Sequence, residues 1–179
     1  MKHFCGFLVV LFVVSSSAHA ADFTLFGGFH RPGKLTLGQA LNTATPDLGI
    51  LTDPKDFGVF GARLFRSNTP VGAEYTVAYS PNFLDSNANA LIYSVNLRAN
   101  LPSPVISPYV TAGIGGVRAG GSGPGAFGNK LAFNYGGGLK ITLIGPVGLR
   151  IDARGYRVRG VEDQSLNLVE ATIGLSYSF

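Results

Sequence analysis

Charged residues at alternate positions of otherwise apolar segments are the feature of this sequence with the clearest chemical potential. Apolar side chains recur at every second residue around them, so the charges share a face with small and polar residues. Basic and acidic groups facing one narrow interior could select passing ions, or could pair with one another and fill that interior. The charged positions on this face are Arg63, Glu74, Arg98, Lys140, Arg150, Asp152, Arg154 and Glu170.

Hairpin geometry predicts which of these charges lie side by side. Directly opposed residues of antiparallel strands lie about 5 Å apart, and diagonal neighbours about 7–8 Å apart. The expected opposed pairs are Arg63 with Glu74, Arg154 with Glu170, and Lys140 with Arg150; the expected diagonal pairs are Asp152 with Lys140 and Arg98 with Glu74. We hypothesise that Arg154 and Glu170 pair within the interior.

The segments that carry these charges have the periodicity of strands and a length of about ten residues, as tilted membrane strands have. The predicted strands are residues 22–31, 56–66, 71–80, 89–99, 108–117, 131–142, 147–157 and 167–179. The charges fall on the small, polar face in each strand, so the apolar face points outward, which only lipid makes favourable. We therefore predict an all-β fold, an eight-stranded antiparallel up-and-down transmembrane β-barrel.

The predicted connections alternate in length. Residues 32–55 form a long connection and residues 118–130 a Gly-rich one, whereas residues 67–70 and 143–146 form tight turns. The seventh connection, residues 158–166, is expected to be another long one. This alternation is typical of a membrane barrel with external loops and short periplasmic turns.

Composition excludes several classes of function. The single cysteine, Cys5, lies in the N-terminal apolar run, so disulfides, thiol catalysis and a Cys-based metal site are not expected. The basic residues are dispersed along the strands, whereas nucleic-acid binding would need them clustered. We expect no metal, no cofactor and no nucleic-acid partner.

The N-terminus has the pattern of a secretory signal peptide. Lys2 precedes an apolar run over residues 4–14, and Ala18-His19-Ala20 supplies an A-x-A cleavage site. The run is too short to span a membrane as a helix. We predict that residues 1–20 are the signal peptide and that residues 21–179 form the barrel domain.

The C-terminus carries the best local match to a known family. Gly174, Tyr177 and Phe179 follow Thr172 in the pattern polar-x-Gly-x-x-aromatic-x-aromatic. With the strand pattern of residues 21–179, this ending resembles the small outer-membrane β-barrels similar to the OmpA transmembrane domain. The resemblance implies an integral protein of the cell outer membrane, in contact with its lipid and inserted by the barrel-assembly machinery. Because Trp is absent, the candidates for the aromatic girdles are Tyr79, Phe83, Tyr93, Tyr109, Tyr177 and Phe179.

Two further motifs have catalytic or nucleotide-binding interpretations that the context does not support. His30 is the only histidine after residue 20, but no His-x-Ser pair accompanies it as in outer-membrane lipid hydrolases. We expect a plain histidine at the outer rim. Residues 123–128 match G-x-G-x-x-G, but a strand follows and Pro124 interrupts the backbone N–H groups that a phosphate needs, so an external loop is expected.

The function predicted from the sequence is that of a non-enzymatic outer-membrane barrel with a structural or surface-interaction role. The alternative is a small passive pore for ions or small solutes. The two differ in whether the interior charges fill the barrel or line a water path. An extracellular ligand cannot be named from the residues.

Overall fold

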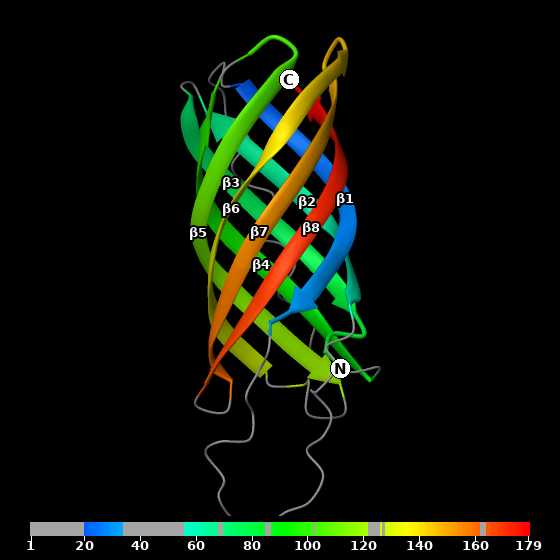
Figure 1. The fold of residues 1–179 in the computed structure, drawn as a ribbon, viewed down its shortest axis with the longest axis vertical. Helices are drawn as coiled ribbons and strands as arrows, with labels where there is room; N and C mark the ends of the chain where they lie inside the picture. Colours follow the sequence, from blue (N-terminus) through cyan, green and yellow to red (C-terminus); the bar gives the residue numbers. More distant parts are fainter. Residues whose placement is uncertain are drawn as a thin grey trace, which may run out of the picture.

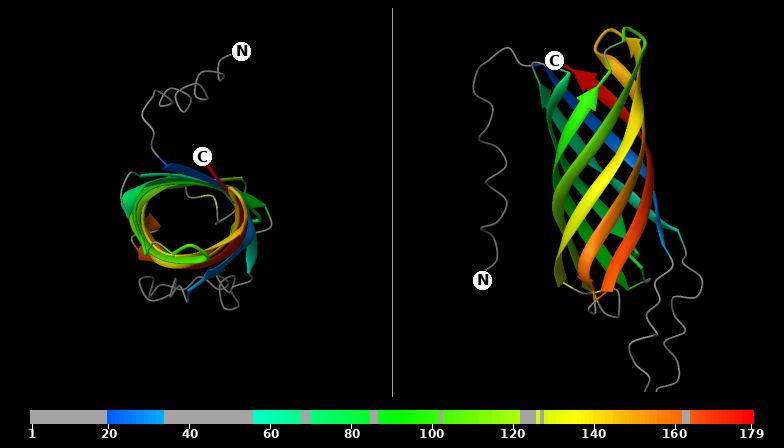
Figure 2. Two further views of the ribbon diagram at one scale, coloured as in Figure 1. Left: turned by 90° about the horizontal axis from the view of Figure 1, so that it is seen from above. Right: turned by 60° about the vertical axis from the view of Figure 1, so that its left-hand side comes forward.

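Eight antiparallel strands close into one barrel (Figure 1). The computed structural model describes residues 20–33, 56–67, 70–84, 87–101, 103–121, 126, 128–161 and 164–179. Seen along the barrel axis, the strands form a ring (Figure 2). The predicted fold class is therefore confirmed. The predicted signal peptide apart from Ala20, which begins β1, and most of the first loop lie outside the described residues. Within the described part, no helix is long and apolar enough to cross a membrane.

Each strand pairs with its neighbour in the sequence, and β8 closes the barrel against β1. Backbone hydrogen bonds between Ala21 and Phe179, 2.8 Å in both directions, extend this closing seam to the last residue. The strands are β1 (Ala20–Pro32), β2 (Phe57–Ser67), β3 (Val71–Pro81), β4 (Ala88–Asn100), β5 (Ile106–Gly121), β6 (Gly128–Ile144), β7 (Val147–Val161) and β8 (Gln164–Ser178).

The strands β5 to β8 are longer than predicted, and one connection changes as a result. β7 and β8 stay paired up to Val161 and Gln164, so only residues 162–163 separate them. The long seventh connection expected over residues 158–166 is therefore wrong. Polar residues there continue the ladder because pairing between antiparallel backbones does not require apolar side chains on both faces.

The outer wall of the barrel is apolar, as expected for a wall that meets lipid. Side chains such as Leu25, Val95, Leu97, Val110 and Leu175 are half exposed or more. Of the candidate girdle residues, Tyr79, Tyr93, Tyr177 and Phe179 lie on this wall. Phe83 and Tyr109 do not: both are buried, so their assignment to the girdles was wrong.

The interior is polar over only part of its height, which corrects the prediction of a polar lumen throughout. Toward the end that carries the β1–β2 connection, inward-facing side chains form a buried apolar layer. Its larger members include Phe57, Val59, Phe83, Ile92, Val117, Val158, Leu166 and Leu168. The outward positions there include Arg118, Arg157, Arg159 and Asn167 beside apolar residues such as Leu91. The contrast found elsewhere, apolar outside and polar inside, is therefore lost or reversed at this level, and the sequence alternation does not reveal the layer.

Gly115 illustrates how closely β4 and β5 approach. A Cβ built on Gly115 would meet the Tyr93 carbonyl oxygen and would lie 2.7 Å from the Ser94 Cα, whereas a Cβ on Gly58 has nothing within 4 Å. We expect Gly115→Ala to destabilise the barrel by about 1–3 kcal/mol, as overpacking does. Gly58→Ala is the matched control and should change the unfolding midpoint little. Equal midpoints for both variants would contradict this close approach.

Candidate functional site

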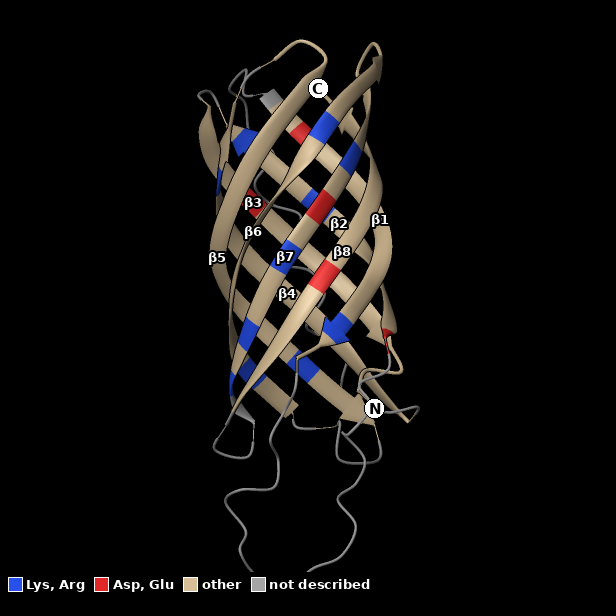
Figure 3. Cartoon of the chain, in the orientation of Figure 1, with Lys and Arg blue, Asp and Glu red and all other residues tan. Residues whose placement is uncertain are grey.

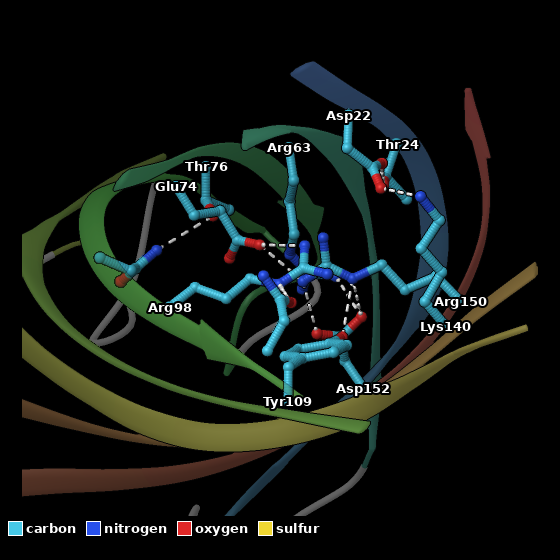
Figure 4. Close-up of polar contacts among 12 residues, drawn as sticks. Asp22, Thr24, Arg63, Glu74, Thr76, Arg98, Tyr109, Lys140, Arg150 and Asp152 are labelled. Atoms are coloured by element: carbon cyan, nitrogen blue, oxygen red, sulfur yellow. Dashed lines mark hydrogen bonds and ion pairs between the residues drawn. The ribbon is translucent and has the colours of Figure 1, made fainter. Parts of the chain in front are cut away.

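Seven charged side chains from five strands meet inside the barrel, and we call them the lumen network. Figure 3 shows charged positions along these strands, and Figure 4 shows the side chains of several members pointing toward one another. The members are Arg63 on β2, Glu74 on β3, Arg98 on β4, Arg150, Asp152 and Arg154 on β7, and Glu170 on β8. All are almost fully buried.

Glu74 is the carboxylate on which three arginines converge. Arg150 Nη2 and Arg154 Nη2 each donate to it at 2.6 Å, one to each oxygen. Arg98 Nη1 donates at 3.3 Å. Because Glu74 is on β3 and two of its partners are on β7, these bonds cross the lumen. They tie opposite walls of the barrel together.

Asp152 is a second centre of the network. Arg63 Nη1 reaches it at 3.0 Å from β2, Arg150 Nε at 3.0 Å and Arg154 Nη2 at 2.9 Å from its own strand. Arg63 Nη2 also donates to Glu170 at 2.6 Å. The cationic groups therefore bridge the carboxylates, which is the arrangement that makes burial of charge tolerable.

Aromatic rings contact the arginines of the lumen network through stacking and a hydrogen bond. The Tyr109 hydroxyl accepts a 2.7 Å hydrogen bond from Arg150 Nε, and its ring lies 4.0 Å from the Arg98 guanidinium carbon. Arg63 stacks over Phe26 at 3.7 Å. Cation–π contacts of this kind gain strength when they are removed from water. The rings also occupy space that water would otherwise fill.

Lys140 belongs to a separate cluster, although the sequence grouped it with the other interior charges. It lies on β6, forms an ion pair with Asp22 of β1 and donates to Ser178 Oγ at 2.7 Å. Thr24 Oγ1 donates to the same aspartate at 3.3 Å. This cluster includes residues of the β1–β8 seam and lies close to the first and last residues of the barrel domain.

The predicted cross-strand neighbours are correct except at the β2–β3 turn. Arg154 faces Glu170 and Lys140 faces Arg150. The register also leaves Asp152 diagonal to Lys140 and Arg98 diagonal to Glu74. Arg63, however, faces Thr76, and Glu74 faces Phe65. The turn is centred one residue later than assumed, so the partner of each β2 residue moves along β3 by two positions. Because two is the side-chain period of a strand, both charges stay on the inner face.

The hypothesis of an Arg154–Glu170 pair is also wrong for the described residues. The two are opposed in register, but Arg154 bonds to Glu74 and Asp152, while Glu170 bonds to Arg63 and His30. Long arginine side chains extend across the lumen to acids on distant strands. Register alone determines which backbones are adjacent and not where such side chains end.

His30 was predicted at the rim and is instead buried inside the barrel. Its Nε2 lies 3.0 Å from Glu170 Oε2, and its ring packs against Phe57 and Tyr156 at centroid distances of 5.4 and 5.8 Å. Its inward phase in the alternation of β1 was the signal that could have placed it. Tyr109 had the same signal, because it shares the inward phase of Thr111.

The network carries more basic than acidic groups. Four arginines oppose three carboxylates, so its formal charge is +1 when His30 is neutral (4 − 3 = +1). Among the described residues, no group of three or more His, Cys, Asp or Glu side chains is placed to hold a metal ion. The arrangement can hold the barrel walls together, and it would favour anions if water passed through.

At the far end of β1, an exposed ion pair stands outside the lumen. Arg31 Nε and Nη2 donate to the two oxygens of Asp56 at 2.8 and 2.7 Å. The hydrogen bond from Arg31 holds the pKa of Asp56 below its ordinary value. Both groups are solvent-exposed, so the pair stabilises the fold little.

An apolar outer wall around a charged and aromatic interior defines an integral outer-membrane β-barrel protein. The chain belongs to the outer membrane protein beta-barrel domain family, whose model matches residues 7–179. The family and outer-membrane location inferred from the C-terminal pattern are thereby confirmed.

Three solved barrels are similar in fold. Neisserial surface protein A shares 11% identity at a TM-score of 0.68, over 89% of this chain and 99% of that one. The N-terminal barrel of Pseudomonas aeruginosa OprF shares 16% at 0.55, over 89% and 97%. The attachment invasion locus protein Ail of Yersinia pestis shares 17% at 0.55, over 90% and 99%. A search of curated protein sequences returned no match.

Proposed function

We propose that this protein is a closed, non-enzymatic barrel that holds its external end at the cell surface for a structural or surface-interaction role. The interior is filled by side chains, and the lumen network serves to fix the walls to one another. Residues 1–20 are proposed to be removed on export. The barrel-assembly machinery is the proposed partner during insertion.

The observation that carries this proposal is that two layers of side chains, one charged and one apolar, fill the lumen. The lumen network bridges β2 and β3 to β7, and β2 also to β8, and a buried apolar layer lies beyond it along the axis. Ile92, Val117 and Leu168 in that layer are at most 1% exposed. An apolar constriction resists wetting, and a salt-bridged one holds its charges in place. Together the two constrictions oppose the passage of ions through the lumen.

The surface-interaction role is supported by what similar folds are called. One neighbour is named a Neisserial surface protein, and another an attachment invasion locus protein. Ail has also been solved in complex with the heparin analogue sucrose octasulfate. These descriptions belong to those proteins. This chain shares with them the barrel fold, which holds external connections at the membrane surface, and recognition usually resides in such loops.

A small passive pore is the second candidate, and the charge of the lumen network gives it a distinct signature. The excess of arginine over carboxylate in the lumen network would give a conducting barrel a preference for anions. That preference makes the pore distinguishable from an unselective leak.

Planar-bilayer recording tests the proposal directly. We expect no steady conductance from the wild-type barrel. Leu168→Gly with Val117→Gly thins the apolar layer and should produce openings if that layer is the seal. A barrel that already conducts steadily, with an anion preference that Arg154→Leu alters, would establish the pore instead.

A further inference from the structure

Three exposed arginines at one end of the barrel wall have no acidic partner among the described residues. Arg118 lies on β5, and Arg157 and Arg159 lie on β7, in the phase that faces outward. Figure 3 shows basic residues gathered at the end of β5 to β7 that lies opposite the C-terminus. This end carries the β1–β2 connection, which the sequence predicts to be external, and we call these three residues the arginine rim.

The charge of the arginine rim is not balanced by the described acids. Every described Asp or Glu side chain is already in an ion pair, in the lumen network, with Lys140, or between Asp56 and Arg31. Arg31 is therefore the contrasting case. It is exposed at the same end of the barrel, but its guanidinium is occupied by a carboxylate at two positions.

The arginine rim follows directly on the lipid-facing wall. On β7 the outward positions run Ile151, Ala153 and Gly155 before Arg157 begins the basic stretch. Arg157 is the cross-strand neighbour of Phe133 on β6, and the Arg159 guanidinium carbon lies 5.0 Å from the Phe133 ring centroid. An aromatic ring followed by cations marks the boundary between hydrocarbon and lipid headgroups, where an outward charge costs little.

We propose that the arginine rim binds the phosphate groups of lipids in the outer leaflet, chiefly of a phosphorylated glycolipid. Guanidinium groups match the oxygens of phosphate with two parallel hydrogen bonds. The direction of the side chains selects a lipid over a soluble ligand. They project sideways from the wall into the plane of the membrane, whereas a soluble ligand would approach along the barrel axis.

Native mass spectrometry of the purified barrel with lipid A, a glycolipid that carries two phosphates, tests this site. The triple variant Arg118→Gln, Arg157→Gln, Arg159→Gln should bind lipid A about tenfold more weakly than wild type, as loss of one or more charge-assisted hydrogen bonds predicts. Arg31→Gln, the matched control, should bind like wild type. Lipid A without its phosphates should bind wild type and triple variant alike. With phosphorylated lipid A, added salt should reduce the difference in affinity between wild type and triple variant.

Three outcomes would overturn the proposal. They are equal lipid A binding by wild type and triple variant, an equal loss in Arg31→Gln, and undiminished binding of dephosphorylated lipid A to wild type. Far-UV circular dichroism of each variant controls for folding, which the exposed positions should not disturb. The result is independent of whether the lumen conducts.

Discussion

Replacing Glu74 by glutamine is expected to destabilise the folded barrel by about 3–5 kcal/mol, the cost of breaking a buried charge pair. Glu74 accepts hydrogen bonds from Arg98, Arg150 and Arg154, so its neutralisation leaves three buried arginines with too few carboxylates to balance them. Denaturant unfolding followed by far-UV circular dichroism measures the loss. Water that enters the lumen would reduce it.

A pair of double-mutant cycles makes this prediction specific to the observed contacts. Glu74→Gln with Arg154→Leu should show strong coupling, because their side chains are 2.6 Å apart. Glu170→Leu with Arg154→Leu should show weaker coupling, because these neighbours bond to other groups. Coupling energies in the opposite order would mean that side-chain pairing follows the strand register after all.

Changing Phe179 to aspartate is expected to remove most of the assembled protein from cells. Phe179 is 68% exposed on the outer wall, at the end of the proposed assembly signal, so a carboxylate there both disrupts the signal and faces lipid. Heat-dependent gel mobility of the membrane fraction measures the assembled share. Refolding into vesicles lacks the machinery and should be affected less.

Ser178→Asp is the matched control for the C-terminus. Ser178 points inward and accepts a hydrogen bond from Lys140, so a carboxylate added there faces the Lys140–Asp22 cluster inside the barrel and does not face lipid. We expect near-normal assembly. A loss equal to that of Phe179→Asp would contradict the assignment of these two residues to opposite faces.

The outer wall and most of the inner charges were predictable because they depend on local order. Alternation with period two assigns a side chain to a face wherever the two faces differ in polarity, as around Arg150, Asp152 and Arg154. A tight turn then determines the residues opposite it, which is why Lys140 and Arg150 were paired correctly. At the β2–β3 turn, a one-residue error in its centre displaced the pairing of Arg63.

The apolar layer and the position of His30 were not predictable in the same way. Whether an inward residue lies at the rim or in the middle depends on how far the strands continue past the last clear alternation. His30 lies two residues before the end of β1, yet the paired ends of β2 and β8 enclose it. Its neighbour Phe57 begins the next strand after the long β1–β2 connection, and its neighbour Tyr156 comes from β7, far along the sequence.

By itself, the sequence determined the strand period, the outward apolar face and the identity of the inward charges. The tertiary structure decided their partners. Closing eight tilted strands brings β3 to face β7 across the lumen, so Glu74 meets Arg150 and Arg154, residues more than 70 positions away. Strand tilt and stagger determine that meeting, and side chains as long as arginine complete it. No local sequence pattern encodes the tilt and stagger of the strands or the carboxylate that each arginine reaches.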